Sequence, residues 1–308
     1  MGLEAALAAR RAHLLSVIPY AAVPGLDVQV VFQHFVRQRL LSFGVRAEEK
    51  IWEAQGVLFF YEQLLWDSAY FQRPMARVRA VLFDPEQILV TNLVQAIEQF
   101  SRHLREAHIQ HCYAEVGAVD NSVLTALGCA GWATVETRLH YYHTLHQLPA
   151  TRAAVRPATL QDVETIRQVA AHNRNPHDRF HADPFFTQAE ADAFLGEYAA
   201  AAVKGLCSIT FVPQHEPVAS FLAVGYLPAD AHLLGMPLGR VVLTAVGPAN
   251  RGWHRHLIDE TLWHTQERGG QLVLLTTQAT NRAVIHNCET TGFKLGSITH
   301  IVSWSQVA

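Results

Sequence analysis

The segment 244–257 contains the residues best suited to bind a phosphate group. Its letters, TAVGPANRGWHRHL, describe an apolar strand that ends in a Gly-Pro turn and leads into a helix whose first turn contains Arg251 and Gly252. A helix N-terminus presents unpaired backbone N–H groups and the positive end of the helix dipole, which together can hold a pyrophosphate. Every strand-to-helix turn in an α/β protein has such N–H groups, however, so the spacing by itself is weak evidence.

The chain has 18 histidines, but their spacing does not predict a metal site. His254 and His256 lie about 200° apart around a helix, so one metal ion cannot take both rings without distortion. His140, His143 and His146 are spaced by three, but their segment predicts a strand running into a linker, where they need not share a face. No fourth ligand stands at a recognised spacing. We therefore expect no metal.

Alternating helices and strands must position the phosphate-binding turn. The apolar spacing predicts two leading helices and then two runs of strands and helices. The leading helices are 3–18 and 28–41; the first run has strands 57–61, 78–82, 111–116 and 132–145 with helices 91–106 and 122–130; the second has strands 207–212, 218–227, 241–246, 272–277 and 293–304 with helices 250–268 and 281–291. The unbroken apolar run 241–246 predicts a central strand buried on both faces. Asn250 is the expected helix cap.

The ends of the two runs resemble each other. Asp120-Asn121 and the later pair Gly131-Trp132 correspond to Asn281 and the later pair Gly292-Phe293. We interpret this as a degenerate internal repeat, although α/β proteins often alternate in this way without one. The expected division is a helical N-terminal extension at 1–50, a first domain at 51–150 and a second at 151–308, in which Thr159 caps the first helix.

Composition excludes several classes of protein. The 308 residues carry 24 Lys plus Arg against 27 Asp plus Glu, a net charge of -3, so no basic field attracts nucleic acid or an anionic membrane. Half the residues are hydrophobic, which predicts a globular protein. The alternation of strands and helices predicts the α/β (α+β) class. Charged residues interrupt the start, so we expect neither a signal peptide nor a membrane span. The four cysteines have no CxxC spacing, and the cytoplasm is the expected location.

The turn and the elements after it resemble the GNAT superfamily of acyl-CoA-dependent acyltransferases. The signature of that superfamily places R-x-x-G-x-G at the helix start and an Asn and a Gly-aromatic pair downstream; Arg251, Asn281 and Gly292-Phe293 match, and His254 and His256 stand where the glycines belong. The resemblance implies tandem GNAT-like domains with mixed central sheets, the first degenerate and the second catalytic. It implies acetyl-CoA as co-substrate, bound by Val246, Arg251, Gly252, Trp253, His254, Arg255, His256 and Asn281. For His254 and His256 two roles stay open: a structural role, or hydrogen-bond donors beside the pyrophosphate.

Three further segments, from about Trp66 onward, resemble the TDP-fucosamine acetyltransferases. They are Trp66–Phe71, Asp178–Asp183 and Thr277–Asn281. This resemblance implies N-acetylation of a nucleotide-linked 4-amino-4,6-dideoxyhexose in surface-polysaccharide biosynthesis. The helices before Trp52 lie outside it.

The implied reaction is attack of a neutral amine on the thioester carbonyl of acetyl-CoA. It requires a polarised carbonyl, a route for the ammonium proton and a proton for the thiolate. The backbone N–H near Val246 is where the family binds the carbonyl. The family's acid is a Tyr seven residues after the Asn, a position that is Cys288 here. Cys288 is either the acid or a packed helix residue, in which case His286, Tyr226 or a water donates the proton.

The loop 178–183 supplies the remaining site predictions. His181 and Asp183 are the expected bases, directly or through water, although His181 is alternatively an ordinary loop residue. Arg179, Phe180 and Tyr226 are the expected substrate-binding residues. Two other functions stay open: a non-catalytic acyl-CoA-binding or scaffold protein, and an N-acetyltransferase acting on another small amine. A homodimer is also considered.

Overall fold

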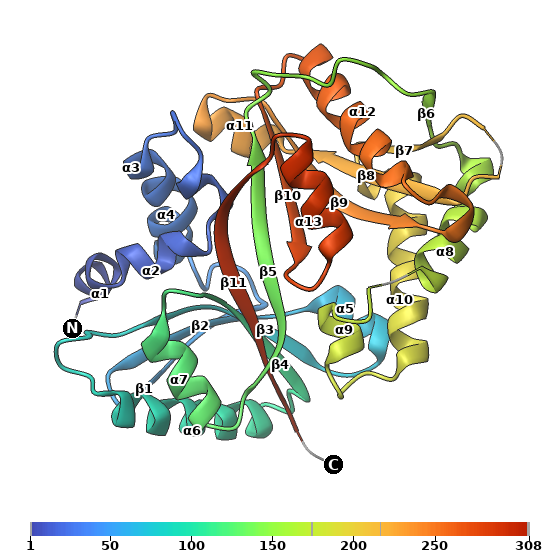
Figure 1. The fold of residues 1–308 in the computed structure, drawn as a ribbon. Coiled ribbons are helices and arrows are strands. Elements are labelled where there is room, and N and C mark those ends of the chain that lie inside the picture. Colours follow the sequence, from blue (N-terminus) through green and yellow to red (C-terminus); the bar gives the residue numbers. More distant parts are fainter. Residues whose placement is uncertain (1, 174, 216, 307–308) are drawn as a thin grey trace. The chain divides into compact units, whose positions relative to one another are not determined.

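A computed structural model describes residues 2–173, 175–215 and 217–306, and the chain divides into two compact units. Unit 1 comprises residues 1–138, 182–185 and 297–308, and unit 2 comprises residues 139–181 and 186–296 (Figure 1). This division differs from the expected one, because the leading helices and most of the last strand belong to unit 1. No helix in the described ranges is both long and apolar enough to cross a membrane.

Unit 1 is built on a mixed sheet with the strand order β1-β2-β3-β4-β11-β5. Its strands are β1 (Glu49–Ala54), β2 (Val57–Gln63), β3 (Met75–Leu82), β4 (His111–Gly117), β5 (Ala133–His143) and β11 (Lys294–Ser305). The pairs β1–β2, β2–β3 and β4–β11 are antiparallel, whereas β3 and β4 are parallel. The mixed sheet agrees with the predicted fold class.

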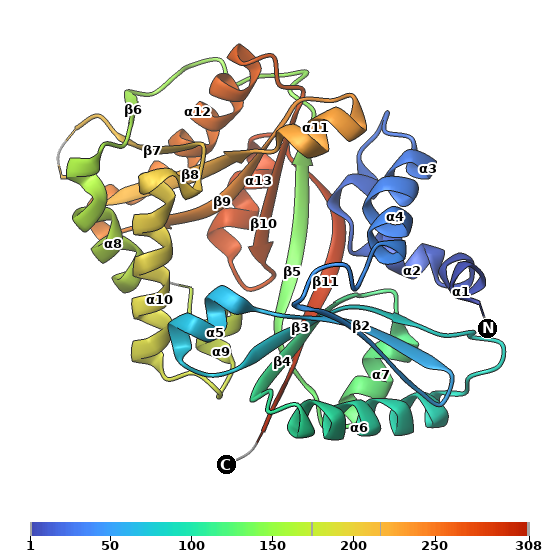
Figure 2. The same cartoon turned by 180° about the vertical axis from the view of Figure 1, so that it is seen from behind.

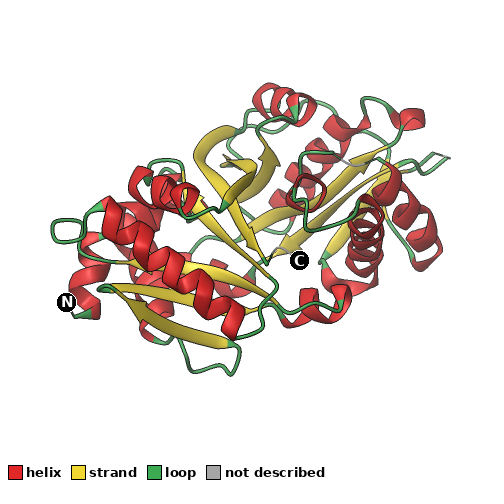
Figure 3. Cartoon of the chain, turned by 90° about the horizontal axis from the view of Figure 1, so that it is seen from below, coloured by secondary structure: helices red, strands yellow, loops and turns green. Residues whose placement is uncertain are grey.

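Helices flank this sheet on both faces (Figure 3). They are α1 (Leu3–Ala9), α2 (Arg11–Ser16), α3 (Val28–Val31), α4 (Gln38–Leu41), α5 (Leu65–Phe71), α6 (Val90–Glu106) and α7 (Asn121–Cys129). Phe100 of α6 stacks on Phe59 in one core, and the leading helices pack against Phe60, Ala80 and Leu82 in another. The leading helices are therefore a layer of unit 1, which corrects their description as an extension.

Unit 2 has the strand order β5-β10-β9-β8-β7-β6. Its elements are β6 (Val155–Pro157), α8 (Val163–His172), α9 (Arg179–Ala182), α10 (Gln188–Ala201), β7 (Ile209–Pro213), β8 (Ser220–Tyr226), α11 (Pro228–Leu234), β9 (Leu238–Val246), α12 (Trp253–Glu267), β10 (Leu272–Gln278) and α13 (Arg282–Thr290). The core that contains Leu257 and Val284 packs on one face, and α8 and α10 cover the other (Figure 2). Thr159 and Asp162 form the predicted capping box.

The two units repeat one order of elements, as the sequence predicted. The order β2-α5-β3-α6-β4-α7 in unit 1 matches β8-α11-β9-α12-β10-α13 in unit 2. Asp120 accepts from the Val123 N–H at the start of α7, and Asn281 accepts from the Val284 N–H at the start of α13. The ends of these helices match as well. The N–H of Trp132 donates to the carbonyl of Leu127 after α7, and the N–H of Phe293 donates to the carbonyl of Cys288 after α13.

Each unit is completed by a strand from the other half of the sequence. The segment Leu139–His143 of β5 belongs to unit 2, where β5 is the neighbour of β10 and His140 Nδ1 lies 3.1 Å from Thr276 Oγ1. The segment Ser297–Ser305 of β11 belongs to unit 1, where β11 pairs with β4. Both strands mix apolar residues with polar and charged ones, so their composition does not determine which of two similar sheets each one joins.

Candidate functional site

The strands β9 and β10 of unit 2 diverge. Among the described residues their parallel pairing is confined to Leu238–Arg240 and Leu272–Leu274, while β9 continues to pair with β8 as far as Val246 (Figure 1). A bulge in the β8–β9 pairing falls at Val242. The run 242–246 is half-exposed, which corrects the expectation of a strand buried on both faces. Beyond Arg240, the pairing that the described residues show for β9 is with β8.

The open end of β9 leads directly into the helix start singled out by the sequence. Gly247 follows Val246, and a Cβ at Gly247 would lie 2.9 Å from the Ala219 carbonyl oxygen, so this turn requires glycine. The α12 helix begins at Trp253 after Gly252, whose φ of 91° favours glycine, and no side chain caps it. The first N–H groups of α12 therefore have no acceptor within the helix. Arg251, Gly252, Arg255 and His256 are exposed around them.

Asn250 does not cap α12. It is buried, and its Oδ1 accepts from the Ala219 N–H at 2.8 Å and from Ser220 Oγ at 3.1 Å. The Asn250 side chain therefore links the turn before α12 to the start of β8. The helix start is left uncapped as a result.

The two histidines in the glycine positions differ in environment. His254 is buried, with Nδ1 3.0 Å from Asn287 Nδ2 on α13, and its Nε2 has no hydrogen-bond partner among the described residues. Burial lowers the pKa of His254 to about 4, so the ring is neutral at pH 7. His256 is exposed, with its ring 5.1 Å from that of Trp253. The geometry favours the structural role for His254, whose ring packs toward α13.

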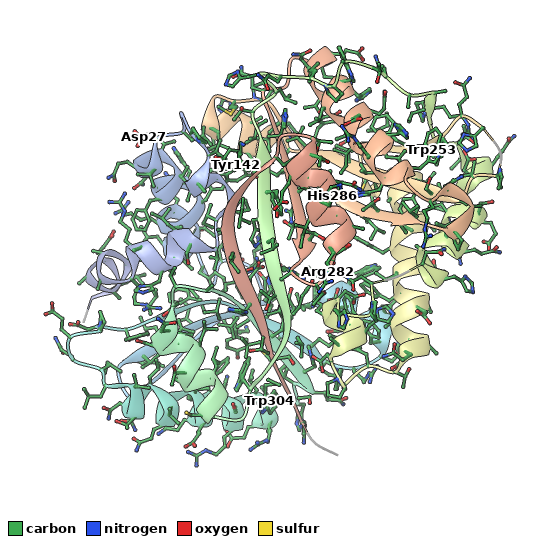
Figure 4. All side chains as sticks on the ribbon, in the orientation of Figure 1. Asp27, Tyr142, Trp253, Arg282, His286 and Trp304 are labelled. Carbon is green, nitrogen blue, oxygen red and sulfur yellow. The ribbon has the colours of Figure 1, made fainter. Side chains whose placement is uncertain are left out.

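Polar side chains from the loop after α8 lie beside the open ends of β9 and β10. Asn173 lies next to Gly247, since a Cβ there would be 3.4 Å from Asn173 Nδ2. Asn175 Nδ2 donates to Gln278 Oε1 at 3.0 Å. Asn281 is half-exposed and caps α13 (Figure 4 labels Arg282 and His286 on this helix). Asn173 and Asn175 were not predicted as site residues, because the only signal for them in the sequence is the polar composition of their loop.

Cys288 lies in the core, not at the strand divergence. Its exposed fraction is 0%, it belongs to the same cluster as Leu257 and Ile258, and burial raises the pKa of its thiol to about 12. The matching position in unit 1 is Leu127, which is also buried and accepts the same backbone hydrogen bond. The geometry therefore corrects the expectation of an acid and favours the alternative of a packed helix residue.

His181 and Asp183 are both held by internal partners. The His181 side chain is fully buried, with Nδ1 2.6 Å from Asp178 and Nε2 3.1 Å from Asp192. Asp183 belongs to unit 1, where its Oδ2 lies 2.9 Å from His111 Nε2. Although burial raises the pKa of Asp183, hydrogen bonds from His111 and the Phe185 N–H lower it overall. Both side chains are positioned as structural groups, which argues against their expected role as bases.

The three expected substrate residues are also placed elsewhere. Phe180 is buried, with its ring 4.2 Å from that of Phe194, and the Arg179 guanidinium lies 4.0 Å from the Phe180 ring. Tyr226 pairs with Gly239, seven residues along β9 from Val246, a separation of roughly 23 Å in an extended strand. Its hydroxyl lies 2.6 Å from His264 Nδ1, and burial raises its pKa. Tyr226 is therefore at the paired end of β9, away from the divergence.

The histidines of β5 form separate contacts. His140 lies beside Thr276, and His143 Nδ1 accepts from the Leu145 N–H at 3.0 Å. The described part of the chain contains no group of three or more His, Cys, Asp or Glu side chains that could hold a metal ion.

Comparison with known proteins gives structural neighbours only. No model of a known protein family and no curated protein matches the chain. A GCN5-related N-acetyltransferase from Sphaerobacter thermophilus aligns with a TM-score of 0.54 and 15% identity over 98% of this chain and 92% of its own. One from Kribbella flavida aligns with a TM-score of 0.51 and 13% identity over 89% of this chain and 95% of its own.

A tandem GNAT protein from the clavulanic acid biosynthesis pathway covers nearly the whole chain. It aligns with a TM-score of 0.50 and 12% identity over 99% of this chain and 96% of its own. These likenesses show the fold: the chain has the GNAT fold in two copies, as predicted. The closer resemblance to TDP-fucosamine acetyltransferases stays a prediction.

Proposed function

We propose that the chain is an N-acyltransferase that moves an acetyl group from acetyl-CoA to a primary amine in unit 2. One observation carries the proposal: β9 and β10 diverge beside an uncapped helix start that exposes Arg251 and Gly252. The fold shared with GNAT proteins supports it.

The cofactor would be held mainly by backbone groups. The N–H groups at Gly252 to His256 suit the diphosphate, and the exposed guanidinium of Arg251 adds positive charge. The half-exposed residues from Val242 to Val246 offer an apolar wall to the pantetheine arm. A backbone N–H in this run would polarise the thioester carbonyl. Because backbone groups make these contacts, His254 and His256 can replace glycines.

The reaction needs proton routes that the buried groups do not supply. The amine nitrogen forms the new C–N bond, the C–S bond breaks, the proton of the attacking nitrogen passes to water, and the thiolate takes a proton from water. Asn173, Asn175 and Gln278 at the open strand ends would orient the amine. Cys288, His181 and Asp183 take no part, since each is buried.

The acceptor proposed from the sequence resemblance is a nucleotide-linked 4-amino-4,6-dideoxy sugar. Its support is the three matching segments; in the first of these, Trp66 is 51% exposed and stacks on Tyr70. Thiol release from acetyl-CoA, measured with the TDP-linked amino sugar and with a panel of small amines, tests this. Release with the small amines alone would replace the sugar by another acceptor. Cytoplasmic location, a homodimer and the lack of nucleic-acid binding also stay predictions.

A non-catalytic acyl-CoA-binding protein is the second candidate. The observation that favours it is the burial of Cys288 at the position where the family has its acid. Acetyl-CoA would then raise the thermal unfolding midpoint, while no amine in the panel would produce thiol above the rate without enzyme. Thiol release that depends on both enzyme and amine would exclude this candidate.

A further inference from the structure

Unit 1 contains the same strand divergence as unit 2. Among the described residues, β3 and β4 pair in parallel over Met75–Val78 and His111–Ala114, and β3 continues to Leu82. The matching strands in unit 2 are β9 and β10, which pair over three residues before they diverge. Unit 1 therefore has the backbone framework of a second cofactor cleft.

The N-terminal helix α2 fills the divergence in unit 1. His13, Leu14 and Val17 line a cavity together with the runs 78–81 and 114–117, and its volume is about 40 Å³. This cavity has room for a few water molecules and not for a pantetheine arm. A second pocket, of about 210 Å³, is lined by Leu14, by residues 35, 36, 39 and 40 and by residues 77–79. At Gly117 the approach is so close that a Cβ would overlap the Ser16 side chain, 2.8 Å from its Cβ. Glycine at 117 is thus what admits α2.

An ion pair fastens α2 at the helix cap. The Arg10 guanidinium pairs with Asp120, and both residues are buried. Asp120 caps α7 and matches Asn281, the cap of α13 in unit 2. A buried charge without its partner is strongly destabilising. Moving α2 away from the sheet would leave Asp120 as such a charge, so the ion pair holds α2 in place. In unit 1 the cap Asp120 is thus covered by Arg10, whereas the matching cap in unit 2, Asn281, is half-exposed.

In unit 1 the turn before α6, the helix that matches α12, is acidic. When the two turns are aligned on Pro85 and Pro248, Asp84 matches Gly247, Glu86 matches Ala249 and Ile88 matches Arg251. Asp84 Oδ1 accepts from the Glu86 N–H at 3.0 Å, so both carboxylates belong to the turn before α6. Carboxylates in this turn would repel a phosphate group.

We propose that the segment 10–17 is the permanent occupant of the cofactor cleft in unit 1, so that the chain has a single acyl-CoA site, in unit 2. The leading helices, for which the sequence resemblance gave no role, thereby occupy the space in unit 1 that a cofactor would take. The count of sites rests on the proposed function; the occupancy of the unit 1 cleft by α2 does not.

Isothermal titration of the full chain with acetyl-CoA measures the number of sites. We expect one site per chain, abolished or weakened at least about tenfold by Arg251→Ala. Two sites, or one site indifferent to Arg251→Ala, would overturn the proposal while leaving acyl-CoA binding intact. No binding at all would refute the proposed function instead, and the occupancy of unit 1 is then decided by the following cycle.

Substitutions at Gly117 and Ser16 test the seating of α2 without any cofactor. Gly117→Ala should lower the thermal unfolding midpoint by about 5 °C or more, because its Cβ displaces Ser16. Ser16→Gly combined with Gly117→Ala should recover more than half of that loss. Gly128→Ala is the matched control, since a Cβ there meets nothing within 4 Å, and it should not lower the midpoint. An unchanged midpoint for Gly117→Ala, or an equal loss in the Ser16→Gly background, would overturn the proposal.

Discussion

Replacing His254 by glutamine tests how the structure accommodates a histidine in place of a signature glycine. The wild-type ring is buried and neutral, with a pKa of about 4 caused by burial, against an ordinary value of 6.5. Protonation is therefore easier in the unfolded chain, and lowering the pH favours unfolding. Glutamine keeps a polar group beside Asn287 but does not titrate.

The size of the effect follows from the two pKa values. At pH 5 the ring is almost fully protonated in the unfolded chain but only about one-tenth protonated in the folded one. His254 should therefore remove about 2 kcal/mol of stability between pH 7 and pH 5. The loss begins as the pH falls through 6.5 and is complete below about pH 4. Other groups titrate in the same range, so the quantity to compare is the difference between wild type and variant.

Urea unfolding of both proteins between pH 7.5 and pH 5 measures this difference. The free energy of unfolding of the wild type should fall by about 2 kcal/mol more than that of His254→Gln. His256→Gln, two residues along and exposed, is the control and should follow the wild type. If the difference between wild type and His254→Gln did not change with pH, His254 would not be a buried neutral ring, and the argument that its side chain avoids the anion would fail.

Three further predictions address the proposed site. Arg251→Ala should weaken acetyl-CoA binding about tenfold by calorimetry and leave the unfolding midpoint unchanged. Lys204→Ala, at an exposed position, should change neither the affinity nor the midpoint. Equal affinity for all three proteins would contradict the diphosphate site. Cys288→Ala should lower the free energy of unfolding by about 1–3 kcal/mol because it opens a core cavity, with turnover within about twofold of wild type; a folded variant with no turnover would restore Cys288 as the acid. His181→Gln should destabilise unit 2 by about 2 kcal/mol, because it disturbs the hydrogen bonds of a fully buried side chain to Asp178 and Asp192, and should leave the pH profile of kcat/KM in place; a displaced profile in a folded variant would make His181 the base.

Local features of the fold were predictable because their signals are local. The correspondence of Asp120 with Asn281, the capping box at Thr159 and the Gly-Pro turn before α12 depend on residues within a few positions of one another. The cap predicted at Asn250 was wrong, because its side chain bonds Ala219 and Ser220 instead. The repeat followed from the matching ends of the two runs, and the tandem fold followed from the resemblance to the GNAT superfamily. The same signals located the helix start with Arg251 and Gly252.

Features that depend on distant partners were not predictable. Nothing in the apolar run 241–246 indicates that β10 turns away from it after three paired residues. The exchange of β5 and β11 is a choice between two similar sheets, which neither strand's composition determines. His181 and Asp183 have residue types suited to bases, but Asp178, Asp192 and His111 hold them, and these contacts exist only in the folded chain.

A crystal structure of the full chain with coenzyme A tests the central claim most directly. We predict that the diphosphate lies within hydrogen-bond distance of the backbone N–H groups at Gly252 to His256, that the pantetheine arm follows the run 242–246 of β9, and that α2 stays in place in unit 1. Coenzyme A bound away from the start of α12, or bound between β3 and β4 with α2 displaced, would contradict the account.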